Sequence, residues 1–241
     1  QLFSSLVDLL RGWRSAGAPG AEPQGPHVDP HRPAAAHGAI PHRPMSPREM
    51  ISVLSLLQTE PPPALGRVIG NPDLSLAQLL KRELLDGARR FGVGDDDVGM
   101  AASDEDAIDL VGMLFDVLLD ERHFEPAARE MLGKLVVPFV KVAVIDRRMF
   151  LHKQHPARRL LNAVAEACEG NRGDGPQERE LLDRARGVTD RLIVEFNEDL
   201  SIFETLESEL RSFLDQNRKR IELAERRAAE SQRGQERLDQ A

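Results

Sequence analysis

The chain has 241 residues, 41% of them hydrophobic but only 4% aromatic and none of them Tyr, so its core must be mainly aliphatic, which suits packed helices better than a β-sandwich. Its 32 basic and 40 acidic residues give a net charge of -8, which argues against binding of DNA or RNA through a broadly basic surface. The single cysteine, Cys168, excludes an internal disulfide and cysteine-based zinc sites, and we expect it to be buried.

The first 45 residues divide into two segments. Residues 1–13 are predicted to form an amphipathic helix, and because the chain begins within this pattern we expect it to be an internal piece of a longer protein. Residues 14–45 are rich in Pro, Gly, Ala and His and are predicted to be a disordered linker. Four histidines lie in the linker, but without cysteines or a rigid scaffold they do not indicate a metal site.

A docking helix is predicted over residues 46–60. Ser46, Pro47 and Glu49 form a capping box with proline at the first helical position. Apolar residues recur at helical spacing, and three consecutive prolines end the helix before a loop over 61–73. The helix could dock onto the main domain or onto another protein, and we expect the former.

The main domain is predicted to be a helical core over residues 74–214. Helices are expected over 75–91 with Ser75 as cap, over 103–121 with Ser103 as cap, over 126–136 and over 156–169. The apolar run 135–145 has strand propensity, but Pro138 inside it favours a buried helix. From Gln177 an unbroken stripe of apolar residues at three and four spacing predicts a long helix.

A charged helical extension with coiled-coil character, or a disordered end, is expected over residues 215–241. The predicted fold is therefore an all-α, multi-helix bundle with a flexible N-terminal linker and a long C-terminal helix. No apolar run approaches the roughly 20 residues that span a bilayer, so we expect no membrane span and a cytoplasmic location.

Two neighbouring segments carry opposite charge. The predicted helix 103–121 is acidic, and its aspartates form one row: Asp106, Asp109, Asp116 and Asp120. The segment 147–162 is basic, with Arg158 and Arg159 in a first helical turn, where the helix dipole disfavours cations. We expect these arginines to pair with Asp109, Asp116 or Asp120. Alternatively, they bind an anion together with the helix N-terminus.

Lys141 and His155 complete the set of candidate binding residues. Lys141 is the only charge in its apolar run, so it should be buried with a partner or extend toward the surface. His155 precedes the predicted helix 156–169, where a capping role is expected. Neither residue has a companion that suggests nucleophilic or metal chemistry, and we predict no catalytic residue, no metal and no cofactor.

Four segments of the sequence carry a family resemblance. They are Asp106-Ala-Ile-Asp-Leu-Val-Gly-Met-Leu-Phe-Asp, Leu135-Val-Val-Pro-Phe-Val-Lys-Val-Ala, His155-Pro-Ala-Arg-Arg-Leu-Leu-Asn and Glu195-Phe-Asn. Over about residues 46 to 220 the chain resembles the DUF1631 family of proteobacterial proteins of unknown function, whose members are usually longer. Some members are labelled thymidine phosphorylase, but the sequence has no Gly/Ser phosphate-binding loop or nucleoside-phosphorylase motif, so this activity is not carried over.

Three functions remain open from the sequence. The preferred hypothesis is a non-enzymatic scaffold or regulatory domain that contacts a protein partner or an adjoining domain, with self-association through the C-terminal helix as a further hypothesis. The second is a sensor of an anion or nucleotide that uses Arg158, Arg159 and Lys141. The third is an enzyme that uses Asp109, Asp116 and Lys141, which would require these groups to converge in a cleft.

Overall fold

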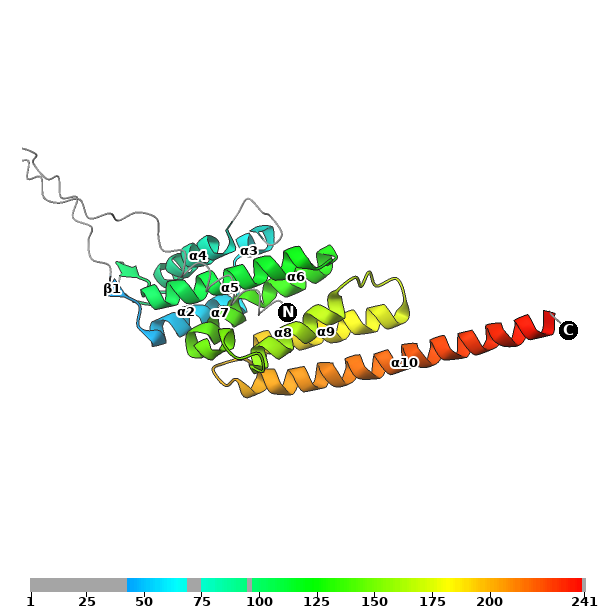
Figure 1. Ribbon diagram of the computed structural model, residues 1–241. Helices are drawn as coiled ribbons and strands as arrows, with labels where there is room; N and C mark the ends of the chain where they lie inside the picture. The colour runs from blue at the N-terminus through cyan, green and yellow to red at the C-terminus, as the bar shows by residue number, and fades with distance from the viewer. Residues whose placement is uncertain (1–42, 69–74, 95–96, 240–241) are drawn as a thin grey trace, which may run out of the picture.

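The computed structural model describes residues 43–68, 75–94 and 97–239, and within them the fold is all-α (Figure 1). The predicted helix 1–13 and nearly all of the linker lie outside the described residues. In chain order the elements are β1 (Arg43–Pro44), α2 (Pro47–Thr59), α3 (Pro63–Val68), α4 (Leu76–Arg90), β2 (Val98–Gly99), α5 (Ala102–Glu121), α6 (Pro126–Lys134), α7 (Val136–Ile145), the 3-10 helix η1 (Arg147–Phe150), α8 (Pro156–Cys168), α9 (Pro176–Glu195) and α10 (Ser201–Asp239).

The first half of the fold is a cluster of α2, α4, α5 and α7. The predicted capping box starts α2: the Ser46 side chain accepts from the Glu49 amide, and Glu49 accepts from the Ser46 amide. The apolar face of α2 packs on α4 and α7, so this helix docks within the chain as expected. Its predicted apolar residues are all buried: Met50, Val53, Leu54 and Leu57.

The second half is a three-helix arrangement of α8, α9 and α10 (Figure 1). Ion pairs define its directions. Arg159 and Glu166 of α8 contact Glu207 and Arg211 of α10 in the same order, so these two helices run parallel. Contacts of α9 with α10 run in the opposite order, from Arg191–Glu209 to Glu180–Arg220, so α9 is antiparallel to α10.

One continuous hydrophobic core joins the two halves, and four aromatic rings mark its path. Phe115 of α5 contacts Phe139 of α7, Phe139 contacts Phe203 of α10, and Phe203 contacts Phe196 after α9, all edge to face with centroids 4.9–5.9 Å apart. α7 lies at the centre of this path. The predicted helix in the run 135–145 is confirmed, because Val136 to Ala143 are all buried and helical.

Several local predictions are corrected. Residues 43–45 belong to the fold and not to the linker, since β1 pairs in parallel with β2 and Met45 is buried. The loop 61–73 contains the short helix α3. Helix α5 begins one residue before the predicted cap Ser103, with Ala101 at the cap position and no side-chain hydrogen bond.

The expected long helix from Gln177 is two helices. The chain turns at residues 196–200, where the Asp199 carboxylate accepts from the amide and the hydroxyl of Ser201 and so starts α10. The turn folds α10 back along α9. Helix α10 then continues past the rest of the described fold, which confirms a long C-terminal helix (Figure 1).

Candidate functional site

His155 occupies the N-cap of α8 and is buried. Its Nδ1 accepts a hydrogen bond from the Ala157 amide at 3.2 Å, which leaves the proton of the neutral ring on Nε2. Nε2 lies 3.6 Å from Oδ2 of Asp146. Burial lowers the pKa of His155, although the charge of Asp146 acts in the opposite direction. His155 thus caps the first turn of α8, at the position where a cap was expected.

Asp146 connects η1 to the start of α8. Its carboxylate accepts from the Arg148 amide at 3.0 Å and from the Arg148 guanidinium at 2.8–3.2 Å. These hydrogen bonds from Arg148 lower the pKa of Asp146 to about 2. The negative charge of Asp146 beside His155 is therefore already matched by the guanidinium of Arg148.

The two arginines of α8 have different environments. Arg158 is buried with 2% exposure, and burial lowers its pKa to about 10. Arg159 is partly exposed, and its guanidinium lies 3.8 Å from Glu207 of α10. The expectation that Arg159 pairs with the aspartate row is therefore wrong, because α10 folds back beside α8 and supplies a carboxylate from a segment more distant in sequence.

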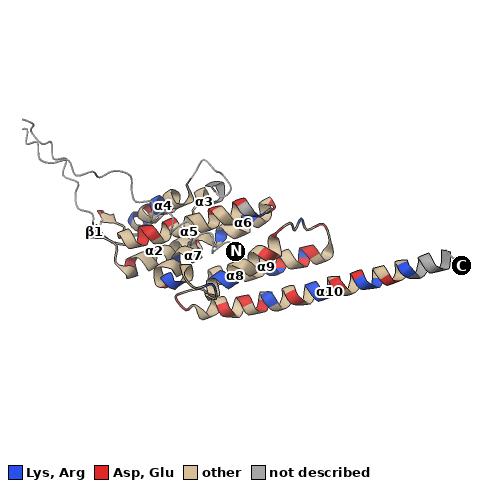
Figure 2. Ribbon diagram, in the orientation of Figure 1, with Lys and Arg blue, Asp and Glu red and all other residues tan. Residues whose placement is uncertain are grey.

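The aspartate row of α5 faces α4 and solvent. Asp109 pairs with Lys81 of α4, Nζ to carboxylate, at 2.8–2.9 Å. Partial desolvation and the charge of Asp120 raise the pKa of Asp116. The acidic and basic segments do meet, but through Asp104 at the start of α5 and Arg147 of η1, 3.2 Å apart. Figure 2 shows the concentration of acidic residues at this end of α5.

Lys141 lies in a buried polar cluster at the C-terminal end of α9, with 1% exposure. Its Nζ donates to the Phe196 carbonyl at 3.3 Å and lies 4.8 Å from the centre of the Phe196 ring. Gln58 of α2 donates from Nε2 to the carbonyls of Ile193 and Phe196, at 2.7 and 2.9 Å.

This arrangement explains why a lysine can be buried here. The last carbonyls of a helix lack partners within the helix and carry partial negative charge, so a cation and an amide donor both stabilise them. Burial lowers the pKa of Lys141, while Glu198 acts to raise it. Lys141 and Gln58 together cap α9, and the two motifs around Lys141 and Glu195 that carry the family resemblance meet at this point.

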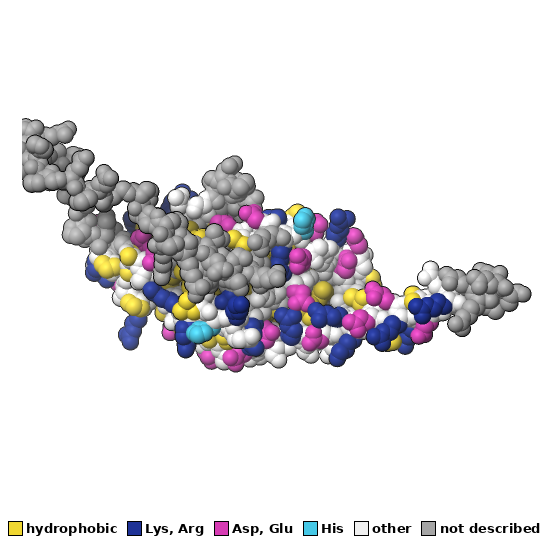
Figure 3. All heavy atoms as spheres, viewed as in Figure 1, with side chains coloured by type: hydrophobic (Ala, Val, Ile, Leu, Met, Phe, Trp, Pro, Cys, Tyr) yellow, Lys and Arg dark blue, Asp and Glu magenta, His cyan; other side chains and the backbone are white. Residues whose placement is uncertain are grey.

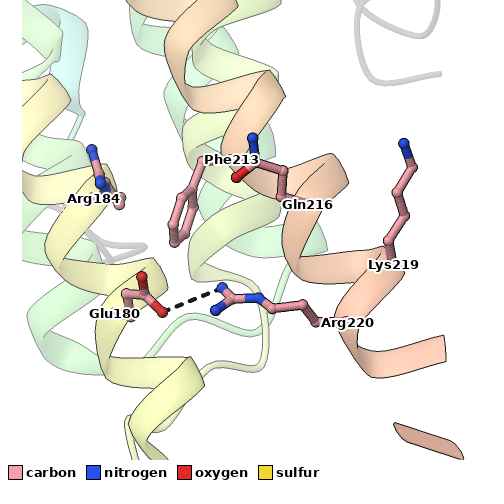
Figure 4. Close-up of a pocket in the computed structure, with 6 residues that line it drawn as sticks. All are labelled: Glu180, Arg184, Phe213, Gln216, Lys219 and Arg220. Carbon is pink, nitrogen blue, oxygen red and sulfur yellow. Dashed lines mark hydrogen bonds and ion pairs between the residues drawn. The ribbon is translucent and has the colours of Figure 1, made fainter. Parts of the chain in front are cut away.

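A shallow groove of about 500 Å³ lies between α9 and α10 (Figure 4). Its lining consists of Glu180 and Arg184 from α9 and Phe213, Gln216, Lys219 and Arg220 from α10. Phe213 lies between the helices with the Arg184 guanidinium 5.0 Å from its ring centre, and Arg220 reaches across to Glu180 at 3.3 Å. The groove carries three cationic side chains against one carboxylate.

Sequence reasoning missed Gln58 and the groove. Gln58 follows Leu54 by four residues, so a polar residue within the buried face of the 46–60 helix was the available signal. The groove had no comparable signal, because it exists only after the chain turns at residues 196–200 and brings Phe213 beside Arg184. Among the described residues, no three His, Cys, Asp or Glu side chains are grouped so that they could hold a metal.

Comparison with known families identifies a family model that matches this chain. The family described as "Protein of unknown function (DUF1631) 2nd domain" matches residues 44–199. The chain belongs to this DUF1631 family. The match begins at β1 and ends at the turn before α10, so it contains the buried cluster around Lys141 and the whole of α9, but not α10 or the α10 side of the groove.

The other comparisons add no functional information about this DUF1631 domain. No curated protein and no solved structure matches the chain. None of the helices in the described ranges has the combination of length and apolar content that crossing a lipid bilayer requires.

Proposed function

We propose that this DUF1631 domain is a non-enzymatic helical module that contacts a protein partner or an adjoining domain, and that α10 is its contact element. The observation that carries the proposal is the outer part of α10. Residues 221–233 are helical and exposed, and they include Ile221 and Leu223 with 40% and 50% exposure. Helices usually depend on tertiary packing for their stability, so an uncovered amphipathic helix is a natural binding element.

The position of these residues on α10 supports this role. The buried row of α10 runs through Leu210, Leu214 and Asn217, and at the same spacing its next member is Ile221. Glu180, which pairs with Arg220, lies about one turn after the start of α9, so α9 no longer covers α10 beyond that point. The face of α10 that α8 and α9 cover is thus uncovered over residues 221–233.

The charges on α10 also fit a contact element. Acidic and basic residues alternate along the outer part of the helix, as Figures 2 and 3 show. Such a surface suits a specific protein contact better than binding to a uniformly charged polymer. The net charge of -8 supports the same conclusion for the whole chain.

The two alternatives have less support. An anion sensor at the start of α8 would need Arg158 and Arg159 to be accessible, but Arg158 is buried and Arg159 lies beside Glu207. An enzyme would need Asp109, Asp116 and Lys141 to converge, yet Asp109 pairs with Lys81 while Lys141 caps α9.

Site-specific photo-crosslinking in cells that produce the protein tests this proposal. A benzophenone amino acid is placed at Leu223 and, as the control, at Arg82, an exposed residue of α4. A discrete protein adduct, or an intramolecular crosslink to another domain, is expected from position 223 and not from position 82. The adduct should disappear when Ile221→Glu is added. Absence of any crosslink at position 223 would contradict a role of α10 in protein contacts.

A further inference from the structure

The groove between α9 and α10 carries cations that the protein does not neutralise. Arg184 contacts the Phe213 ring, and within the described part of the chain neither Arg184 nor Lys219 forms an ion pair with a carboxylate. Arg220 is paired with Glu180. The groove therefore has positive charge on a chain whose net charge is -8.

Apolar surface continues from the groove along α10. Phe213, Gln216, Arg220 and Leu223 follow one another at spacings of three, four and three residues, which places them on one side of the helix. Phe213 is half-buried in the groove, whereas Leu223 is 50% exposed beyond the start of α9. An elongated surface results, with apolar groups along its length and cations beside them.

We propose that this surface binds an acidic amphipathic segment of a partner protein, with carboxylates at Arg184 and Lys219 and apolar side chains against Phe213 and Leu223. This inference rests on the proposed function and names the chemistry of the partner. An extended segment fits because the surface follows α10 over about three helical turns, or about 15 Å. Charge complementarity gives such a contact its specificity and its rate of association.

The geometry disfavours two other occupants. A small anion needs cations that converge on one point, whereas Arg184 and Lys219 lie on different helices at opposite sides of the groove, as seen in Figure 4. A nucleic acid base needs an open aromatic face, but the Arg184 guanidinium already lies over the Phe213 ring.

Fluorescence anisotropy on the full chain at low ionic strength tests the proposal. The probe is a labelled 20-residue amphipathic peptide in which Leu and Glu each recur at helical spacing, so that they form an apolar face and an acidic face. In the comparison probe, Lys replaces Glu. The groove variant R184E/K219E is compared with R82E/K153E, which reverses two exposed cations on α4 and before α8. Each variant changes the net charge by the same amount, from -8 to -12, because each reversal changes it by -2.

The acidic peptide should bind the wild type and the R82E/K153E control with equal affinity. It should bind the R184E/K219E variant at least about tenfold more weakly, because attraction becomes repulsion at both substituted positions. The Lys peptide should bind the groove variant more tightly than the wild type. L223S should weaken binding of the acidic peptide by about threefold or more through lost apolar contact, and L151S, at another exposed leucine, should not.

Several results would overturn this inference. The acidic peptide could bind the wild type and the groove variant with equal affinity, or not bind at all. ATP or inorganic phosphate could displace the bound peptide, or single-stranded DNA could bind to the wild type and not to the groove variant. Light scattering that shows a dimer which R184E/K219E dissociates would identify a second copy as the occupant and also refute an acidic partner. If crosslinking at Leu223 succeeds while the acidic peptide fails, only the partner class is wrong, whereas failure of both removes the proposed function as well.

Discussion

Substitution of Gln58 by Met tests whether α2 holds the end of α9. Gln58 is 4% exposed, and its amide donates to the carbonyls of Ile193 and Phe196. Met has a similar length and volume, so Q58M removes both donors with little change in packing. The loss of stability then measures the hydrogen bonds themselves.

The expected magnitude follows from the partners that remain. The Ile193 carbonyl loses a donor at 2.7 Å, and a buried acceptor left without a partner costs about 1–3 kcal/mol. The Phe196 carbonyl keeps Lys141 as a donor, so loss of the hydrogen bond from Gln58 to this carbonyl costs only about 0.5–1.5 kcal/mol. Gln58 Oε1 is buried without a hydrogen-bond partner in the described structure, and its removal offsets part of this cost. The net destabilisation expected for Q58M is about 2 kcal/mol.

Urea denaturation followed by circular dichroism at 222 nm measures this difference. A loss of about 2 kcal/mol lowers the midpoint by about 1 M urea if the slope is about 2 kcal/mol per M. Q78M makes the same chemical change at an exposed position of α4 and should stay within about 0.5 kcal/mol of the wild type.

A double-mutant cycle with K141M sharpens the test. Replacing a buried charge by an apolar group of similar size is often nearly neutral, so K141M alone should change stability by no more than about 1 kcal/mol. It should cost more in the Q58M background, where Lys141 is the remaining side-chain donor to Phe196. If the Q58M protein is as stable as the Q78M protein, or if the effects of Q58M and K141M are additive, Gln58 and Lys141 do not cap α9 together.

Three further predictions concern pH, close packing and thiol chemistry. The pKa of His155 is lowered on folding, so the contribution of His155 to stability should be complete above about pH 6.5 and should decrease as the pH falls below that value. The folded pKa of Asp146 is about 2, so the contribution of Asp146 to stability should be lost between about pH 5 and 2. Urea denaturation of H155N at a series of pH values should not show the first decrease in stability, and that of D146N should not show the second. Profiles of stability against pH that match the wild type would contradict both assignments. Gly112→Ala should destabilise the protein by about 1–3 kcal/mol in thermal melts, because the new Cβ would lie 2.9 Å from Cβ of Ala77. Gly187→Ala is the control: this position in the middle of α9 has open space around it, so the substitution should stabilise the protein by about 0.5–1 kcal/mol. Cys168 should react with a disulfide reagent only on unfolding, because it is fully buried and burial raises its pKa to about 12; rapid labelling of the native protein would show that α8 is not packed as described.

The sequence predicted those features that depend on local signals. The start of α2 followed from Ser46, Pro47 and Glu49, all within four residues, and the helical state of α7 followed from the position of Pro138. The buried face of α5 followed from its spacing of apolar residues: Ile108, Val111, Leu114, Phe115 and Leu118 are all buried. These inferences need only backbone geometry and helix caps.

The features that were missed depend on contacts between distant parts of the chain. Apolar residues keep helical spacing across the turn at 196–200, so periodicity could not reveal it, although Asp199 before Ser201 was a local cap signal. Once the turn places α10 beside α8, Glu207 becomes the partner of Arg159. Complementary charges in a sequence identify groups that can pair, but the topology selects which of them do.

The capping of α9 by Gln58 also bears on how the domain folds and opens. The hydrogen bond from Gln58 to Phe196 joins residues 138 positions apart, so the end of α9 obtains its partners only when α2, α7 and α9 have all assembled. Contacts of such long range slow folding and bind separate segments into one cooperative unit. Amide protons in α2 and in the last turn of α9 should therefore exchange with solvent together, in a single opening event, even though the two helices belong to different halves of the fold.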